Sequence, residues 1–222
     1  MPSISVVIPV LNDAAVLERL LTDLGSSHLE VVVVDGGSQD NSVAVAGRFG
    51  YRVFDTPPNR GLQLNTGVRH SAGAWLWLLH ADSTVSPAIV AAVAEIANGP
   101  AGWGRFDVEF AAASAMLKVI AQGMNHRSWL TGICTGDQGM FVHRSLLEAI
   151  GGVPEQPLME DVELSKRLRR IGKPVRRREL LTTSTRRWQR HGVIRTMARM
   201  WWLRLRYFFG ADPEVLVRDY YD

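Results

Sequence analysis

Three carboxylate positions in the chain could do chemistry. Asp35 closes one apolar run, Asp82 follows another, and the pair Glu160-Asp161 opens a helical pattern after a loop rich in Gly and Pro. A carboxylate just past a buried strand is held rigidly and still reaches solvent. It can contact ribose hydroxyls, bind a hard divalent cation or act as a general base. Taken singly, each of these residues is more often a loop cap than a catalytic group.

Strands and helices alternate around these positions. Residues 4–10 form a β-branched run, residues 29–34 are apolar at every position, and the apolar residues between them recur at helical spacing. A strand that is apolar on both faces indicates a parallel sheet covered by helices. We therefore predict an α/β fold with a mostly parallel central sheet and helices on both faces. The expected strands are 4–10, 29–34, 51–54, 74–79, 103–110, 140–143 and 175–180, and the expected helices are 16–24, 40–49, 62–72, 87–97, 111–124, 145–150, 162–171 and 192–209.

Polar residues collect where the expected strands of the first half end. They are Asn12, Asp13, Asp35, His80 and Asp82. Ligands of open α/β sheets bind along this edge, so we expect the site there.

Length and composition exclude several classes of protein. The 222 residues favour one domain, and 46% hydrophobic with 21% charged residues excludes a disordered or collagen-like chain. The single cysteine, Cys134, excludes an internal disulfide and a Cys-based zinc site. Residues 1–5 lack the pattern of a signal peptide, and the longest conspicuous apolar run, 74–79, is too short to span a bilayer. We expect a cytoplasmic protein.

The net charge of +3 hides an asymmetry between the two halves. Residues 1–111 carry 6 Lys and Arg against 11 Asp and Glu, whereas residues 112–222 carry 19 against 11. Basic clusters at 167–170 and 176–178 could bind nucleic acid, phosphate or anionic lipid, but a solvated helix face and loop explain them better. No nucleic-acid partner is predicted.

Several nucleotide-binding and hydrolytic motifs are missing. The first expected strand ends in Pro9-Val10-Leu11-Asn12 where a dinucleotide fold would carry G-x-G-x-x-G, and neither a P-loop nor a G-x-S-x-G elbow occurs. A sugar nucleotidyltransferase would need a glycine-rich basic loop after this strand, and that loop is absent too.

Four segments in order resemble the signature of family 2 glycosyltransferases, enzymes of the GT-A fold that use nucleotide-activated sugars. They are Ser5 to Asn12, Val33 to Asp40, Leu79 to Ser83 and Met159 to Leu164. The L-H-A-D and G-D-Q-G-x-F motifs resemble a bacterial subgroup labelled arsenosugar-biosynthesis-type glycosyltransferases.

The resemblance implies a role for each matched position on the donor side. Pro9, Leu11 and Asn12 would form the floor of the nucleotide pocket, with Leu11 against the base, and Asp35 would bind the base or the ribose. His80-Ala81-Asp82 stands at the D-x-D position, where Asp82 would hold Mg²⁺ or Mn²⁺ on the diphosphate of the donor. UDP is expected over GDP.

On the acceptor side the resemblance makes Asp161 the general base, with Glu160 as the alternative. Asp137 and Gln138 would face the acceptor and the sugar together with His80. The base would act on the face of the sugar opposite the leaving diphosphate, so inversion at the anomeric carbon is expected.

The chain departs from the family pattern in two places. His80 replaces the first D-x-D carboxylate and is a poorer ligand for a hard cation. The segment 59–67 has Leu64 where many relatives carry Arg, so Arg60 or Gln63 would substitute, and Gln63 and Asn65 are placed among the donor-binding residues.

Arg187-Trp188 resembles the end of a Q-x-x-R-W motif. The two residues would close over the diphosphate and the sugar, or instead form a cation packed on a core aromatic side chain.

We predict a single GT-A-like domain over 1–222, with a nucleotide-binding half at 1–100, an acceptor-binding half at 101–191 and a basic, aromatic helical tail at 192–222. The predicted function is metal-assisted, inverting sugar transfer to a hydroxyl. The alternatives are a catalytically silent GT-A-like binding module and a sugar nucleotidyltransferase. The tail would contact the inner face of the membrane, or pack on the domain or on a second subunit in a homodimer.

Overall fold

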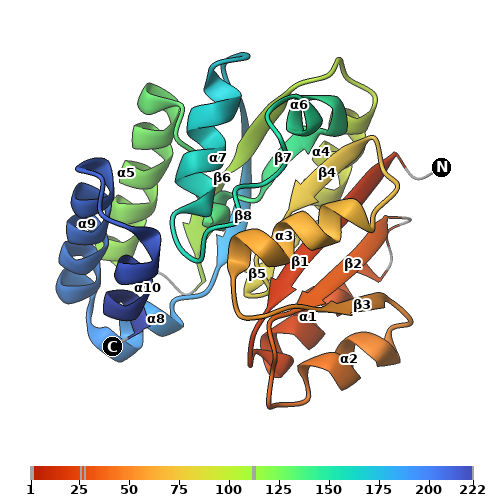
Figure 1. Cartoon of the computed structure of the whole chain (residues 1–222), viewed down its shortest axis with the longest axis horizontal. Helices are drawn as coiled ribbons and strands as arrows, with labels where there is room; N and C mark the ends of the chain where they lie inside the picture. Colours follow the sequence, from red (N-terminus) through yellow and green to blue (C-terminus); the bar gives the residue numbers. More distant parts are fainter. Residues whose placement is uncertain (1–2, 26, 28, 112–113, 222) are drawn as a thin grey trace.

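One mixed sheet organises the molecule (Figure 1). The computed structural model describes residues 3–25, 27, 29–111 and 114–221. Within them the strands lie in the order β3-β2-β1-β4-β7-β6-β8-β5. Their bounds are β1 Ile4–Val10, β2 Glu30–Asp35, β3 Arg52–Asp55, β4 Trp75–Leu78, β5 Ser83–Thr84, β6 Trp103–Phe110, β7 Met140–His143 and β8 Val175–Thr183.

Helices cover both faces of this sheet, as predicted. One core cluster joins the sheet to α1, α2 and α4, and a second joins it to α3, α6 and α7. The bounds are α1 Ala14–Leu24, α2 Ser42–Arg48, α3 Arg60–Arg69, α4 Pro87–Ala97, α5 Ala115–Thr131, the 3₁₀ turn η1 Gly136–Gln138, α6 Arg144–Ala149, α7 Glu160–Arg169, α8 Arg186–His191, α9 Val193–Phe208 and α10 Pro213–Tyr221.

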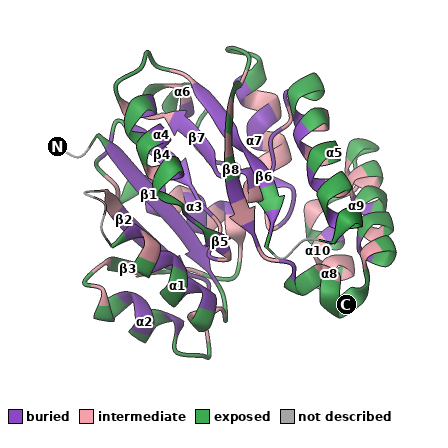
Figure 2. Ribbon diagram, turned by 180° about the vertical axis from the view of Figure 1, so that it is seen from behind, coloured by how far each residue is buried: buried purple, intermediate pink, exposed green. Residues whose placement is uncertain are grey.

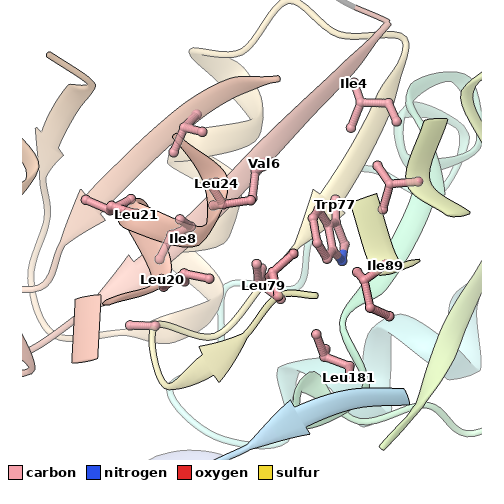
Figure 3. Close-up of a cluster of buried hydrophobic side chains, with 14 of the residues drawn as sticks. Ile4, Val6, Ile8, Leu20, Leu21, Leu24, Trp77, Leu79, Ile89 and Leu181 are labelled. Atoms are coloured by element: carbon pink, nitrogen blue, oxygen red, sulfur yellow. The ribbon is translucent and has the colours of Figure 1, made fainter. Parts of the chain in front are cut away.

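The apolar side chains of β1 point into both core clusters. Ile4, Val6 and Ile8 point into the cluster with α1 and α4, where they meet Leu20 and Ile89 (Figure 3). Val7 points into the other cluster. Successive side chains of a strand alternate between faces, so a strand with helices on both sides must be apolar throughout.

The strand order creates a crevice beside β1. Strands β2 and β4 flank β1 and both run parallel to it, and the chain reaches them by helical crossovers in opposite directions. Loops after β1 and β4 therefore diverge above their carboxyl ends, which is where open α/β sheets bind ligands.

The second half of the sheet is less regular than predicted. β7 runs antiparallel to both β4 and β6, while β8 is parallel to β6 with a register shift between Phe106 and Asp107. Gly104 on β6 allows this close pairing, because a Cβ there would lie 2.1 Å from the Val175 carbonyl oxygen.

Helix α5 runs seven residues beyond its predicted end at Met124. The start of the prediction falls partly on residues 112 and 113, outside the described residues. The extra turns pack through polar groups: Asn125 accepts from the Val108 N–H at 2.8 Å and donates to the Val108 carbonyl at 2.9 Å. Hydrophobic periodicity cannot detect a helix face held by hydrogen bonds.

The tail of the chain packs on the segment that precedes α7. Leu203 of α9 and Leu216 of α10 form a buried cluster with Leu158 and Met159. The outer surfaces of α5 and α9 are exposed (Figure 2). No helix in the described part of the chain is both long and apolar enough to cross a membrane.

Candidate active site

Asp35 anchors the loop after β2 at the predicted nucleotide end of the crevice. Its Oδ2 accepts hydrogen bonds from the N–H groups of Gly37 at 2.9 Å and Ser38 at 2.7 Å. Its Oδ1 is buried and has no hydrogen-bond partner among the described residues. A buried carboxylate oxygen without a donor is costly, so this atom is available to a ligand hydroxyl or N–H.

The loop after β1 is tied to the same turn. Asn12 adopts the left-handed conformation at φ 53°, donates its N–H to Ser38 Oγ at 2.8 Å and accepts from the Gln39 N–H at 2.7 Å. Leu11 beside it is 37% exposed, whereas Pro9 and Ala81 are buried. The arrangement leaves one apolar side chain open above the strand ends, as the predicted contact of Leu11 with a base requires.

The side chains of Gln63 and Asn65 form hydrogen bonds that join α3 to other parts of the protein. The buried Gln63 amide donates to the carbonyls of Val10 and Val34, both at 2.9 Å, and so clamps the ends of β1 and β2 together. Asn65 bonds to Glu155 Oε1 at 2.5 Å and to the Val153 N–H at 3.3 Å. Both side chains depart from the predicted donor contact, because their hydrogen bonds go to protein groups.

His80 and Asp137 pair across the cleft, with 3.5 Å between Nδ1 and Oδ1. Burial by itself lowers the pKa of His80, but Asp137, helped by Asp82, raises it above the usual value. Burial raises the pKa of Asp137, yet His80, Arg204 and Arg60 outweigh this and lower it to about 2. The cleft therefore favours an imidazolium next to a carboxylate.

Asp82 lies half-buried beside this pair. Burial raises the pKa of Asp82, and the negative charges of Asp137 and Asp13 raise it further, against the opposing effect of His80 and Arg186. Asp82 therefore lies where further negative charge is disfavoured and a cation would be stabilised.

Gly136 brings the end of β4 against the start of α7. A Cβ on Gly136 would lie 2.1 Å from His80 Nε2, so only glycine permits this contact. The Gly136 N–H donates to Asp161 Oδ2 at 2.9 Å, and Asp161 Oδ1 accepts from the Val162 N–H at 2.7 Å. A small pocket between these elements is lined by Leu64, Leu78, His80, Gly136, Met140, Glu160, Asp161 and Leu164.

Glu160 is more deeply buried than Asp161. Its Oε1 lies 3.4 Å from Arg60 Nη1, and its Oε2 has no hydrogen-bond partner among the described residues. Burial raises the pKa of Glu160, and Asp161 adds to this against the opposing charge of Arg60. Met159, just before it, has φ 64°, a left-handed conformation that a non-glycine residue adopts at a cost.

The Gln138 side chain is fully buried under η1. Its Oε1 accepts from the Thr135 N–H at 3.2 Å, and its Nε2 donates to Asn125 Oδ1 at 3.3 Å. Gln138 therefore departs from the predicted contact with sugar or acceptor and fixes the turn that presents Asp137.

The predicted Arg187-Trp188 pair is engaged elsewhere, and its neighbour reaches the cleft. Arg187 stacks over the Tyr220 ring at 4.2 Å, and the Trp188 ring lies 5.3 Å from that of Phe110. Arg187 is exposed and Trp188 half-buried, so the two side chains pack on separate aromatic rings. Arg186 pairs with Asp13 at 2.8 Å. Successive helical residues point about 100° apart, so the start of α8 decides which arginine reaches Asp13.

Sequence reasoning missed three charged residues of the cleft, Arg127, Arg186 and Arg204, and placed Asp13 at the strand ends without giving it a role. Asp13 and Arg186 stand next to residues that the motifs singled out. Arg127 and Arg204 lie on helices whose packing no motif encodes.

The residues fit a divalent cation only in part. Within the described ranges no group of three or more His, Cys, Asp or Glu side chains is arranged to hold a metal ion. Asp82, which accepts no hydrogen bond from another described residue, fits one oxygen ligand of such an ion. Further ligands would have to be oxygens of the donor diphosphate and water.

Similar solved structures define the fold as GT-A-like. S. aureus TarS in complex with UDP matches with TM-score 0.66 and 17% identity over 82% of this chain and 60% of that one. A mannosyltransferase of Pyrobaculum calidifontis in complex with GDP-Man and Mn²⁺ matches with TM-score 0.59 and 22% identity over 82% of this chain and 56% of that one. Glucosyl-3-phosphoglycerate synthase of Mycobacterium tuberculosis, with Mg²⁺ and UDP, has TM-score 0.58 and 20% identity, covering 82% and 70%.

The sequence comparison gives the family. Residues 5–148 match glycosyl transferase family 2, and the chain belongs to that family. The probable glycosyltransferase YdaM of Bacillus subtilis is 27% identical over 205 residues, which cover 79% of this chain and 49% of YdaM. A PGL/p-HBAD biosynthesis glycosyltransferase of Mycobacterium bovis is 36% identical over 94 residues, 38% of this chain and 37% of that protein. The chain spans about half the length of YdaM and less of the others.

The His80–Asp137 pair predicts a measurable pH dependence. Asp137→Asn removes the main group that raises the pKa of His80, so we expect the imidazole pKa to fall in an NMR titration. In the unsubstituted protein the pair stabilises the fold fully below pH about 6.5, the unfolded value, and this contribution is lost as pH rises through the raised folded pKa. The exposed Asp55→Asn variant serves as the control. An unchanged His80 titration in Asp137→Asn would contradict the pairing.

Proposed function

We propose that the chain transfers a sugar from a nucleoside diphosphate sugar to an acceptor hydroxyl, with inversion at the anomeric carbon and assistance from Mg²⁺ or Mn²⁺. The observation that carries the proposal is the meeting of His80, Gly136 and Asp161 in one pocket beside Asp82. The TarS and Pyrobaculum structures, bound to UDP and GDP-Man, support a nucleotide donor.

Asp161 is the proposed general base. It is half-buried and held by two backbone N–H groups, whereas Glu160 is 1% exposed and paired with Arg60. Asp161 takes the acceptor proton as the acceptor oxygen bonds to the anomeric carbon. The bond from that carbon to the diphosphate breaks on the opposite face, so the configuration inverts.

Donor binding falls to the loops after β1, β2 and β4. Leu11 offers an apolar surface to the base, Asp35 a free carboxylate oxygen to ribose or base, and Asp82 a ligand to the cation. When bound, the cation supplies positive charge that offsets charge developing on the departing diphosphate. UDP is the proposed nucleotide, and the L-H-A-D motif supports membership of the arsenosugar-biosynthesis-type subgroup.

Metal-dependent nucleotide binding tests the donor site. We expect UDP to raise the Tm of the protein, and Mn²⁺ to increase that shift, because Asp82 and the diphosphate share the ion. Asp82→Asn should abolish the Mn²⁺-dependent part, while Glu148→Gln, an exposed change on α6, should leave it intact. Equal UDP affinity in EDTA and in Mn²⁺ would count against Asp82 as a ligand.

Replacement of the base tests the reaction. Asp161→Asn should lower release of UDP from a UDP-sugar by roughly 10²–10⁴-fold, as expected for loss of a general base, and leave UDP affinity nearly unchanged. Near-normal turnover would refute the assignment and point to Glu160.

The same assays distinguish the alternative functions. A protein that binds UDP but turns over none of a panel of donors would match the silent binding module. Formation of a nucleotide sugar from a nucleoside triphosphate and a sugar phosphate would match the nucleotidyltransferase.

A further inference from the structure

Two arginines on neighbouring helices face the cleft carboxylates without partners of their own. Arg127 lies on α5 and Arg204 on α9, and both are partly buried. In the described part of the chain the side chain of neither arginine makes a hydrogen bond or an ion pair. The Nε and Nη2 atoms of Arg127 are both buried and unsatisfied. Donors in this state carry a desolvation cost that native structures rarely leave uncompensated.

The electrostatics of the pair call for an anion. Burial, followed by the like charge of Arg204, lowers the pKa of Arg127 to about 10, against the opposing effect of Asp161 and Asp137. The like charges of Arg127 and Arg204 oppose each other, and a phosphate or carboxylate beside Arg127 would offset this opposition and accept the orphaned N–H groups of Arg127.

The position of the pair favours the acceptor over the donor. Helix α5 contacts the turn η1 through the hydrogen bond from Gln138 to Asn125 at 3.3 Å, and the carboxylates that act on Arg127 are Asp161 and Asp137. The hydroxyl that reacts must come within hydrogen-bond reach of the base, so the acceptor is the substrate that passes closest to Arg127.

Helix α5 is fixed firmly enough to present Arg127. Its neighbour Ser128 accepts from buried Arg105 Nε at 3.1 Å, and the Asn125 carbonyl accepts from Arg105 Nη2 at 2.8 Å. Such a polar network around a binding residue holds the side chain in place before the ligand arrives.

We propose that Arg127 and Arg204 form a subsite for an anionic group, of phosphate chemistry, on the acceptor. The inference rests on the proposed function, because it is the assignment of Asp161 as base that makes the neighbouring substrate the acceptor. The anionic group belongs either to a soluble phosphorylated acceptor or to a lipid headgroup.

Inorganic phosphate is the probe for this subsite. With UDP and Mn²⁺ saturating, we expect phosphate to bind the full chain, and Arg127→Gln to weaken it by roughly 10- to 100-fold, the range for a charge-assisted hydrogen bond. Arg127→Lys should recover only part of the affinity, because lysine keeps the positive charge but lacks the planar guanidinium with its paired N–H donors. UDP affinity should change less than twofold, and Arg170→Gln on the exposed end of α7 should behave as the parent.

Stability and ligand source give independent readouts. The Tm of ligand-free Arg127→Gln should stay the same or rise, because a cation without a partner is removed.

Vesicle binding distinguishes the two sources of the anionic group. If Arg127→Gln loses phosphate binding alone, the acceptor is soluble. If it also loses binding to phosphatidic acid vesicles, the group is a lipid headgroup. Unchanged phosphate binding, or an equal loss of UDP affinity, overturns the proposal. If UDP fails to bind the parent protein the proposed function fails, and phosphate binding without nucleotide still tests the arginine pair.

A second, independent observation concerns the outer face of α9. Thr196 and Leu203 lie on its buried face. The opposite face carries an exposed apolar stripe at helical spacing, which we call the outer stripe: Ile194, Met197, Trp201, Leu205 and Phe208. Trp201 is 72% exposed and Phe208 76%, and α5, whose outer surface is also exposed, adds the exposed Val119 and Trp129. An apolar surface of this extent marks an interaction site.

The charge around the outer stripe selects its occupant. Helices α5, α8 and α9 carry nine Lys and Arg and no Asp or Glu. Three of the nine lie toward the cleft and Arg206 pairs with Asp219, which leaves the exposed Lys118, Arg187, Arg190 and Arg195 to the outer surface. A two-fold contact between copies of the chain would bring this basic surface against itself. An anionic bilayer neutralises it and accepts the aromatic rings at the headgroup boundary. We infer that the outer stripe docks on an anionic phospholipid surface.

Vesicle sedimentation tests the docking. The chain should pellet with vesicles of 30% phosphatidylglycerol in phosphatidylcholine, bind pure phosphatidylcholine far less, and be released by 0.5 M NaCl. Replacing Trp201 and Phe208 with Ser should reduce binding at least tenfold, while Val43→Ser on the exposed face of α2 should not. Absence of binding at low salt overturns the inference, as does a dimer, detected by ultracentrifugation, that the double variant dissociates and that does not bind vesicles.

Discussion

The site depends on a close contact between a residue without a side chain and an imidazole. Gly136 lies so near His80 that any Cβ would overlap the ring, and its N–H holds the Asp161 carboxylate. Three separate elements, the end of β4, the turn η1 and the start of α7, therefore converge on one backbone unit. Because protein interiors are close-packed, a displacement at this point would move the imidazole and the carboxylate together.

Buried polar groups, rather than apolar packing alone, hold these elements in place. Gln63 clamps the carboxyl ends of β1 and β2, and Gln138 ties η1 to Asn125 on α5. Arg105 and Asp107 add a buried ion pair on β6. Networks of this kind are costly when incomplete, so they specify one arrangement of the loops above the sheet.

The fold brings charged residues of the acidic first half and the basic second half of the chain together. Asp13 of the acidic first half pairs with Arg186 of the basic second half, and Arg186 also acts on Asp82. The tail contributes to the site in two ways. Helix α9 supplies Arg204, and the buried face of α9 packs on Met159, directly before Glu160 and Asp161 of α7.

The sequence by itself determined the layers and the family. Continuous apolar runs in β1 and β2 required helices on both faces. The motifs around Asp35 and Asp82 lie within the match over 5–148 that bears out the family, and the motif around Asp161 lies beyond it. These features are local: a strand's periodicity and a motif are both read within about ten residues.

Tertiary structure alone decided which polar side chains face the cleft. Gln63 and Gln138 lie within matched or neighbouring segments but form their hydrogen bonds with the scaffold, and the helical phase of α8 brings Arg186 rather than Arg187 to Asp13. The junction of Arg127 with Arg204 joins residues 77 positions apart in the chain. Orientation and long-range proximity follow from how helices pack, and neither is encoded in the spacing of residues along one segment.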